Sequence, residues 1–250
     1  MSGHSKWHSI KHKKGAADKA RGKLFAKLIK QIEVSAREGG GDTTSNATLR
    51  TMVQNARDAS VPIDTIERAV KRGTGELEGV RYEPMSFEGY APNGVAVYVE
   101  CLSDNRNRTT AEVKNAFTRN GGSLAQPGAV AWQFERKGVV ILEKAATTED
   151  DLMLAALDAG AEDIADQGDT WQVTTGPSEL HTVRGAIEEA GIAVTSSDLT
   201  MIANQTVPLR DQATAGAVLR LVDVLEEHDD VQAVHANFDI PDEVLQAVLT

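Results

Sequence analysis

The sequence is poor in cysteine and in aromatic residues. Its 250 residues contain a single cysteine, Cys101, so no disulfide can form within the chain. Such low cysteine content is typical of proteins from a reducing compartment, and we expect a cytoplasmic protein. Aromatic residues make up only 4% of the sequence, so the hydrophobic cores must be built from aliphatic side chains and alanine.

Long apolar segments and common catalytic motifs are also missing. No run of eighteen apolar residues occurs, and no apolar segment follows the basic N-terminus as in a secretory signal, so we expect no membrane association. The nucleotide-binding patterns GxxxxGK[ST] and GxGxxG are absent, as are HExxH, CxxC and GxSxG. His4, His8 and His12 recur every four residues, but they have no carboxylate beside them and lysines surround them. We therefore expect no cofactor, no metal site and no enzymatic activity.

Charge is distributed very unevenly along the chain. The net charge is −11, which alone argues against binding to nucleic acid. Residues 1–72, however, contain 15 Lys or Arg and 7 Asp or Glu, whereas the rest of the chain contains 11 and 30. A basic segment is attracted to phosphate and an acidic body is repelled by it. The N-terminal part is therefore the predicted nucleic-acid-binding part.

The spacing of apolar residues predicts an α+β fold that begins with a three-helix bundle. Residues 1–18 show no helical or strand period, which predicts a flexible basic arm. Helices are expected from residue 19 to the glycines at 39–41, over 45–59, and from Pro62 to Gly73. Three short helices with short connections predict a helical domain over residues 19–75.

After a glycine-rich linker, the pattern changes to alternating strands and helices. Strands are expected at 94–102, 129–134, 139–142, 170–175, 200–203, 206–209 and 234–238, and helices at 105–120, 149–159, 178–190 and 211–227. This order contains two β-α-β-β-α-β sets. We expect two ferredoxin-like α/β domains, one inserted in the other: a split domain over 80–135 and 205–250, and an inserted domain over 136–204. A single larger α+β domain is the alternative.

The predicted nucleic-acid site begins in the basic arm. Its residues are Lys6, Trp7, His8, Lys11, His12, Lys13 and Lys14. Lysines neutralise phosphates and release counterions, and Trp or His rings can stack on unpaired bases. The alternative is a tail that only keeps the protein in solution, but such a tail would give Trp7 no role.

Two further groups of residues extend the predicted site. The first helix carries a basic stripe, which is either a phosphate-binding surface or a solvated helix face. Its members are Lys19, Arg21, Lys23, Lys27 and Lys30.

The second group stands where a strand meets a helix, with Asp104 as the expected helix cap. Asn105, Arg106, Asn107 and Arg108 could bind a phosphate or an RNA backbone there. The alternative is a structural turn whose arginines pair with acidic residues. Acidic residues elsewhere, such as Glu162, Asp163 and the run at 226–230, are expected to be solvated surface.

Long contiguous stretches resemble the YebC/PmpR family of bacterial proteins. They are MSGHSKWHSIKHKKGAADKARGKLFAKLIKQIEVSAREGGGD, VPIDTIERAVKRGTGE, FEGYAPNGVAVYVECLSDNRNRTTAEVKNAF and GSLAQPGAVAWQFERKGVV. The resemblance covers the whole chain and extends to a mitochondrial relative, the translational activator of cytochrome c oxidase subunit one. It implies a helical first domain followed by two α/β domains, one inserted in the other.

The resemblance implies a role in gene expression of one of two kinds. One is a transcriptional regulator that binds promoter DNA. The other is a ribosome-associated translation factor that contacts ribosomal RNA or tRNA and eases the synthesis of proline-rich stretches. A thin, glycine-containing basic arm favours RNA slightly, because it suits folded RNA better than duplex DNA. The alternatives outside this class are a protein-interaction scaffold and a metal-dependent enzyme with an acidic interdomain cleft. The sequence does not indicate an oligomeric state.

Overall fold

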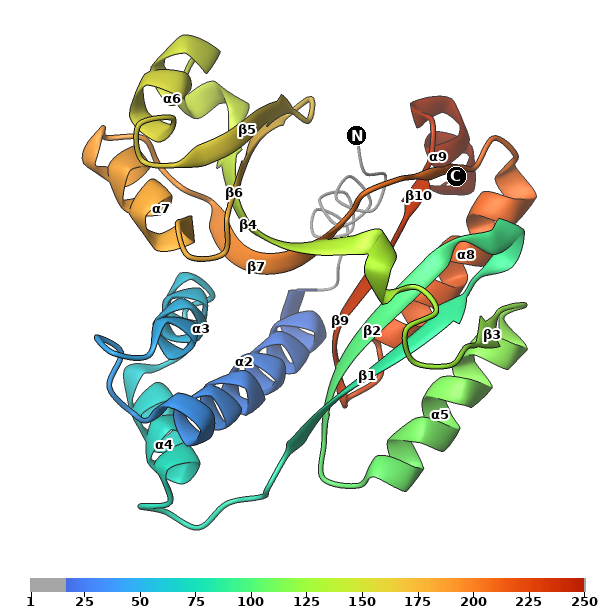
Figure 1. The fold of residues 1–250 in the computed structure, drawn as a ribbon, viewed down its shortest axis with the longest axis horizontal. Helices are drawn as coiled ribbons and strands as arrows, with labels where there is room; N and C mark the ends of the chain where they lie inside the picture. The colour runs from blue at the N-terminus through green and yellow to red at the C-terminus, as the bar shows by residue number, and fades with distance from the viewer. Residues whose placement is uncertain (1–16, 250) are drawn as a thin grey trace.

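The structure is a computed structural model that describes the backbone of residues 17–249 and the side chains of residues 21–248. It has the expected α+β fold, in which a group of helices is followed by two helix-covered antiparallel sheets (Figure 1). No helix of this described part is long and apolar enough to cross a membrane. The flexible arm was predicted over residues 1–18; residues 1–16 lie outside the described residues, whereas Ala17 and Asp18 already belong to the first helix.

The helical domain consists of α2 (Ala17–Gly39), α3 (Ala47–Asp58) and α4 (Ile63–Thr74). Their apolar faces meet in one core because each carries aliphatic residues at helical spacing. The buried side chains of this core include Leu28, Ile32, Leu49, Val53 and Ile66. Helix α2 ends at Gly39, and Gly40 adopts a φ of +83° that favours glycine. Helix α3 is capped by Asn46, whose side chain accepts a hydrogen bond from the Leu49 N–H at 3.0 Å.

The end of α4 differs from the sequence prediction. Gly73 was expected to end this helix, but the helix continues to Thr74 and Gly75 takes the left-handed conformation with a φ of +85°. Gly73 is buried inside the helix, and a Cβ atom there would lie 2.4 Å from the carbonyl oxygen of Glu33 in α2. Glycine is therefore needed at position 73 because α4 packs directly on the backbone of α2.

The split domain contains a four-stranded antiparallel sheet with the order β3-β1-β2-β9. Its strands are β1 (Glu83–Tyr90), β2 (Ala96–Ser103), β3 (Ser123–Leu124) and β9 (Val231–Ala236). Helices α5 (Arg106–Arg119) and α8 (Gln212–Glu226) cover one face of the sheet (Figure 1). The core between them includes Val97, Val99, Phe117 and Leu221. A short parallel pair, β8 (Val207–Pro208) with β10 (Phe238–Asp239), and helix α9 (Asp242–Leu249) complete this domain.

The inserted domain follows the predicted β-α-β-β-α-β order. It consists of β4 (Phe134–Glu143), α6 (Glu149–Ala156), β5 (Ala161–Asp166), β6 (Thr170–Thr175), α7 (Leu180–Glu189) and β7 (Ser196–Ala203). The antiparallel strand order β5-β6-β4-β7 is that of a ferredoxin-like sheet. Val140, Val173, Leu152 and Ile187 belong to its core, between the sheet and the two helices. Three single-turn 3-10 helices lie in the connections, namely η1 (Pro92–Gly94), η2 (Ala131–Gln133) and η3 (Lys144–Ala146).

Several strands were placed wrongly from the sequence. Two short strands were expected at 129–134 and 139–142. The structure has instead one long strand over residues 134–143, and residues 129–133 do not form a strand. The buried carboxylate of Glu88 accepts the backbone N–H groups of Gly128, Val130 and Ala131 at 2.7–2.8 Å, so these groups cannot pair in a sheet. Strands β1, β3 and β5 and helix α9 were not predicted, and β8 pairs with β10 outside the main sheet.

The helical domain contacts both other domains. Helix α3 packs against β7 of the inserted domain, where Arg184 donates to Asp58 at 2.8 Å and Asn55 donates to Asp198. Arg184 is buried, and it also donates to Ser197 at 2.7 Å. Helix α2 contacts the split domain through lysines, which are described below. The exact boundaries between the three domains stay a prediction.

Candidate nucleic-acid interface

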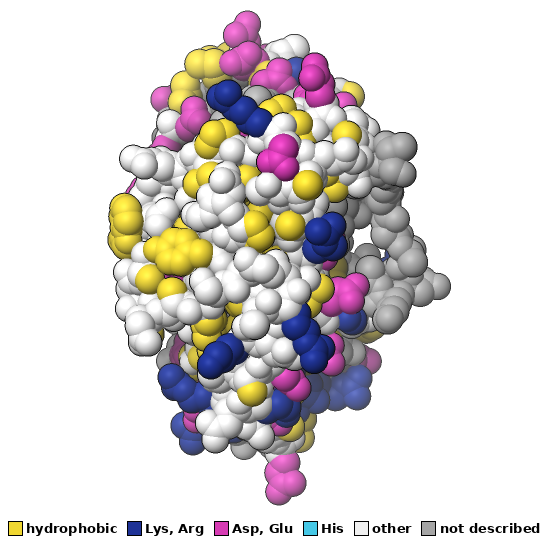
Figure 2. Space-filling model, turned by 90° about the vertical axis from the view of Figure 1, so that its right-hand side faces the viewer, with side chains coloured by type: hydrophobic (Ala, Val, Ile, Leu, Met, Phe, Trp, Pro, Cys, Tyr) yellow, Lys and Arg dark blue, Asp and Glu magenta, His cyan; other side chains and the backbone are white. Residues whose placement is uncertain are grey.

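Charged side chains are segregated over the molecule. On the face drawn in Figure 2, most basic side chains lie in the lower half, where acidic ones are mixed with them, and the upper end carries mainly acidic side chains. The predicted arm residues Lys6, Trp7, His8, Lys11, His12, Lys13 and Lys14 lie outside the described residues, and so does the side chain of Lys19. Arg21 is exposed on α2. The described part of the candidate interface therefore consists of the rest of the basic stripe and the group at 104–108.

The lysines of the basic stripe face the split domain. Lys23 Nζ donates to the carbonyl oxygen of Glu227 at 2.8 Å, and Lys27 Nζ donates to that of Glu226 at 2.9 Å. Glu226 is the last residue of α8, whose final carbonyls have no partner within the helix and carry the negative end of the helix dipole. Ammonium groups are favourable there, so these lysines hold α2 against the end of α8. Binding of the same lysines to nucleic acid stays a prediction.

Lys30, the next lysine of the stripe along α2, contacts a buried carboxylate. Its Nζ donates to the carbonyl oxygen of Asp229 at 3.0 Å and lies 3.2 Å from Asp230 Oδ1. The other carboxylate oxygen of Asp230 accepts hydrogen bonds from Arg108 at 2.7 Å, Thr109 at 2.8 Å and Ser103 at 3.1 Å. Burial raises the pKa of Asp230, but the hydrogen bonds from Arg108, Thr109 and Lys30 and the charge of Lys30 lower it to about 2. Asp230 is therefore an ionised junction between α2, β2, α5 and β9.

This junction corrects one expectation. The acidic run at 226–230 was expected to be solvated surface, whereas the side chain of Asp230 is only 6% exposed. The sequence offers a weak signal for this, because Asp230 directly precedes the buried start of strand β9 at Val231. Glu162 and Asp163 are exposed, as predicted.

The group at 104–108 forms the start of helix α5. Asn105, and not Asp104 as expected, caps this helix, because its side chain accepts a hydrogen bond from the Arg108 N–H at 3.1 Å. The Arg108 guanidinium donates to Asp104 at 2.8 Å and to Asp230, which matches the alternative of a structural turn. These hydrogen bonds raise the pKa of Arg108 above its usual value. Arg106 and Asn107 are exposed, and no ion pair of Arg106 is found within residues 21–248.

A groove of about 700 Å³ runs beside the Asp230 junction. It is lined by Lys23, Lys30, Tyr82, Asp104, Arg108, Glu112, Glu227, His228, Asp229 and Asp230. Five of these side chains are carboxylates and three are Lys or Arg, so the groove as a whole repels phosphate. The nucleic acid is therefore expected to bind elsewhere.

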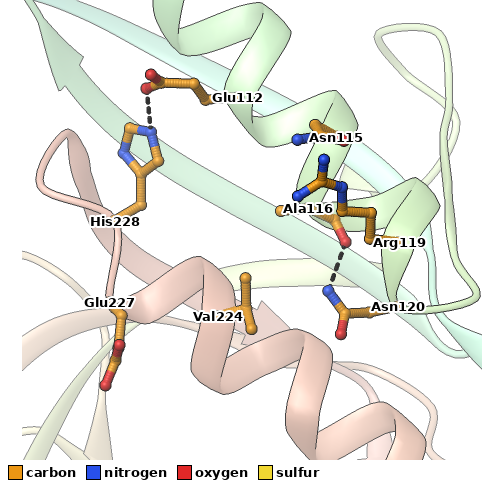
Figure 3. A pocket seen from close by; sticks show the side chains of 8 residues that line it. All are labelled: Glu112, Asn115, Ala116, Arg119, Asn120, Val224, Glu227 and His228. Carbon is orange, nitrogen blue, oxygen red and sulfur yellow. Dashed lines mark hydrogen bonds and ion pairs between the residues drawn. The ribbon is translucent and has the colours of Figure 1, made fainter.

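A smaller hollow of about 250 Å³ opens between α5 and the end of α8 (Figure 3). His228 spans it, and its Nε2 lies 2.8 Å from Glu112. Its Nδ1 accepts the Asp230 N–H at 3.1 Å, which places the ring proton on Nε2, where it is donated to Glu112. His228 therefore fixes the turn that carries Asp230.

Exposed cations on α3 and α4 were missed by the sequence analysis. Arg57 and Lys71 are exposed, and neither forms an ion pair within the described part of the chain. Arg50, Gln54 and Arg57 are spaced to share one face of α3. Their residue types were visible in the sequence, but only the fold shows which face of α3 is left free. The adjacent positions 55 and 58 contact Asp198 of β7 and Arg184 of α7.

Comparison with known proteins gives matches over almost the whole chain. Residues 5–76 match the family model described as the TACO1/YebC protein N-terminal domain, and residues 82–238 match that of the TACO1/YebC second and third domain. A protein named probable transcriptional regulatory protein from Halothermothrix orenii is 52% identical over 99% of each chain. A protein of the same name from Mycolicibacterium smegmatis is 56% identical over 98% of this chain and 97% of its own. The crystal structure of a conserved hypothetical protein from Aquifex aeolicus superposes with a TM-score of 0.86, at 45% identity, over 95% of this chain and 98% of that one.

Proposed function

This chain belongs to the TACO1/YebC family, and on that premise we propose that it regulates gene expression in the cytoplasm by binding nucleic acid, without enzymatic activity. The observation that carries the proposal is the separation of charge. Residues 1–72 contain eight more cations than anions, whereas the rest of the chain contains nineteen more anions than cations. A polyanion is drawn to the first part and repelled by the second, so binding is local and oriented.

Exposed cations occur in the helical domain and also in the split domain, for example Arg106, Lys114 and Arg119 on α5, but only those of the helical domain lie in the segment with net positive charge. Arg21, Arg57 and Lys71 are exposed, whereas Lys23, Lys27 and Lys30 already hold carbonyl groups of the split domain. We therefore assign direct phosphate contact first to the arm and to the exposed cations. Lys23 and Lys27 contribute positive charge at longer range, since a carbonyl partner does not cancel their charge, whereas the charge of Lys30 is balanced by the ionised Asp230.

RNA is the proposed physiological target, as ribosomal RNA or tRNA on the ribosome. A thin basic arm with Trp7 suits unpaired and folded RNA, in which bases are open to stacking. Stacking on Trp7 would add affinity that does not depend on phosphate charge.

Promoter DNA is the second candidate. The name of the relatives favours it, and so does the shared face of Arg50, Gln54 and Arg57, which are side chains that read bases in a major groove. Asp58 and Asp198, however, lie where α3 meets β7 and would repel the DNA backbone. Duplex DNA therefore fits this helix less well than RNA fits the arm.

One experiment separates the two candidates. Co-sedimentation with ribosomes and a mobility shift with promoter DNA are compared at about 150 mM salt, where non-specific binding is weak. We expect co-sedimentation that is lost when Lys11, Lys13 and Lys14 are changed to alanine and that is kept in Lys144→Ala, which removes an exposed cation of the inserted domain. A DNA shift that depends on Arg57 without ribosome binding would favour transcription. Binding to neither would overturn the proposal.

A further inference from the structure

Helix α6 is apolar on two faces. Leu152 and Ala156 point into the core of the inserted domain. Met153, Leu154 and Leu157 lie on the opposite side, where Leu154 is 79% exposed and Leu157 is 47% exposed. A surface helix of a monomer normally presents polar residues outward, and a helix with apolar residues on both sides is normally covered on both sides. Figure 1 shows α6 at the outer end of the inserted domain, away from the helical domain.

Carboxylates surround this apolar face. Asp150 stands four residues before Leu154, so the helix places it beside this leucine, and Glu149 precedes it. Asp158 follows in the turn directly after the helix end at Ala156 and the capping Leu157. All three are exposed, and none forms an ion pair within residues 21–248. Asp151 is different, because it accepts a hydrogen bond from the capping Thr148 at 2.7 Å. The exposed leucines are thus bordered by negative charge that nothing in the described chain neutralises.

The whole inserted domain has the same sign of charge. Residues 136–204 contain 13 Asp or Glu and only 4 Lys or Arg. Each of the four cations is already paired with a carboxylate: Arg136, Lys137, Lys144 and Arg184. In Figure 2 the charged side chains at the upper end of the molecule are mainly acidic, and this is the end that carries α6 in Figure 1. No free cation of this domain is therefore left to attract an acidic partner.

We propose that the surface formed by Met153, Leu154, Leu157, Asp150 and Asp158, here called the α6 surface, docks a basic protein segment. The segment carries Lys or Arg around one or two large apolar side chains. Its apolar side chains cover the leucines and its cations meet the aspartates, so both features are used together. Nucleic acid is excluded as the occupant because its phosphates would face the carboxylates. A second copy of the α6 surface is disfavoured because it would bring like charges together.

The inference does not depend on the nature of the nucleic acid. Proteins that are themselves bound to nucleic acid are commonly basic, so the α6 surface gives this chain a second attachment point at the end opposite to its basic part. The small apolar area indicates a weak and transient contact.

The test uses the full-length protein and a fluorescent, helical peptide of lysine and leucine, with the leucines along one face. Fluorescence anisotropy measures the binding of this peptide and of two matched control peptides. In one control serine replaces every leucine, and in the other glutamate replaces every lysine. We expect only the first peptide to bind, with an affinity that Leu154→Ser lowers about tenfold or more. The variant Ile63→Ser is the control, since Ile63 is 58% exposed on α4 in the basic helical domain and should not matter.

Two further measurements keep the proposal falsifiable. Circular dichroism tests whether Leu154→Ser is folded. We expect that it is, because the Leu154 side chain is 79% exposed and its replacement leaves the core unchanged. The double variant Asp150→Asn, Asp158→Asn should bind the peptide more weakly and with less dependence on salt. Equal binding to wild type and Leu154→Ser, or equal binding of the serine peptide, would overturn the proposal. So would a dimer in sedimentation analysis that Leu154→Ser abolishes.

Discussion

Lys30 and Asp230 are 200 positions apart in the chain, yet Lys30 Nζ lies 3.2 Å from Asp230 Oδ1. The contact joins α2 to the turn between α8 and β9. Because Asp230 also binds Ser103, Arg108 and Thr109, a single carboxylate links the helical domain to two other elements of the split domain. The placement of the basic helix relative to the acidic body depends on this junction.

Replacing Asp230 by asparagine should destabilise the protein strongly. The amide cannot balance the charges of Lys30 and Arg108 and cannot accept all of their hydrogen bonds, and because both cations are partly exposed the expected loss is about 1–3 kcal/mol. Chemical denaturation measures the loss of unfolding free energy. The neighbouring change Asp229→Asn is the matched control, because Asp229 is exposed and binds Lys30 only through its backbone carbonyl. Equal effects of the two changes would contradict the role of the junction.

The low pKa of the Asp230 carboxyl predicts that the stability of the protein depends on pH in the acidic range. The pKa of Asp230 falls from 3.8 to about 2 on folding, so its contribution is complete above pH 4 and is lost as the pH falls from about 4 to 2. The lost contribution is about 1–2 kcal/mol, allowing for solvent screening at its partners. Unfolding of wild type and Asp230→Asn should therefore differ less at pH 2.5 than at pH 6. A constant difference would show that Asp230 does not titrate as described.

The variants Lys27→Ala and Arg21→Ala should distinguish cations that hold α2 against the split domain from cations that bind nucleic acid. Lys27→Ala removes a cation from the end of α8 and should lower the unfolding free energy by about 0.3–1 kcal/mol. Arg21→Ala removes an exposed cation and should weaken RNA binding with almost no change in stability. Thermal unfolding and RNA binding are measured on both variants. The reverse pattern would mean that the stripe lysines, and not the exposed cations, contact phosphate.

Glu88 should control the loop at residues 125–131. Burial raises the pKa of its carboxyl, but hydrogen bonds from the backbone of Gly128, Val130 and Ala131 outweigh this and lower the pKa. In Glu88→Gln, the amide NH₂ faces backbone N–H groups and leaves donors unpaired, at a cost of about 1–3 kcal/mol. Hydrogen exchange of the loop should become faster. Exposed Glu83 in the same strand provides the control variant Glu83→Gln, which should leave exchange unchanged.

Strong local periodicity explains which parts of the fold could be predicted. The three N-terminal helices, and the inserted domain except for its second strand, follow from apolar spacing and from glycines at helix ends. Strand β1 was missed because EPMSFEGY contains proline, glycine and two glutamates, and β5 was missed because AEDIAD is acidic. Their partners in the sheet, and not their own propensities, make them strands.

Long-range contacts explain what could not be predicted at the candidate site. The basic stripe was recognised as a surface, but its docking onto α8 depends on residues about 200 positions away. The burial of Asp230 likewise appears only when β2, α5 and α2 meet around it. Local sequence shows which side chains carry charge, whereas the fold decides which of those charges remain accessible.

The salt dependence of RNA binding tests the central claim most directly. The slope of log K against log salt concentration is measured for wild type and for a variant with Lys11, Lys13 and Lys14 changed to alanine. Each lost phosphate contact should flatten the slope by about 0.7 on single-stranded RNA. We predict weaker binding and a slope reduced by up to about 2. An affinity and a slope identical to those of wild type would contradict the account.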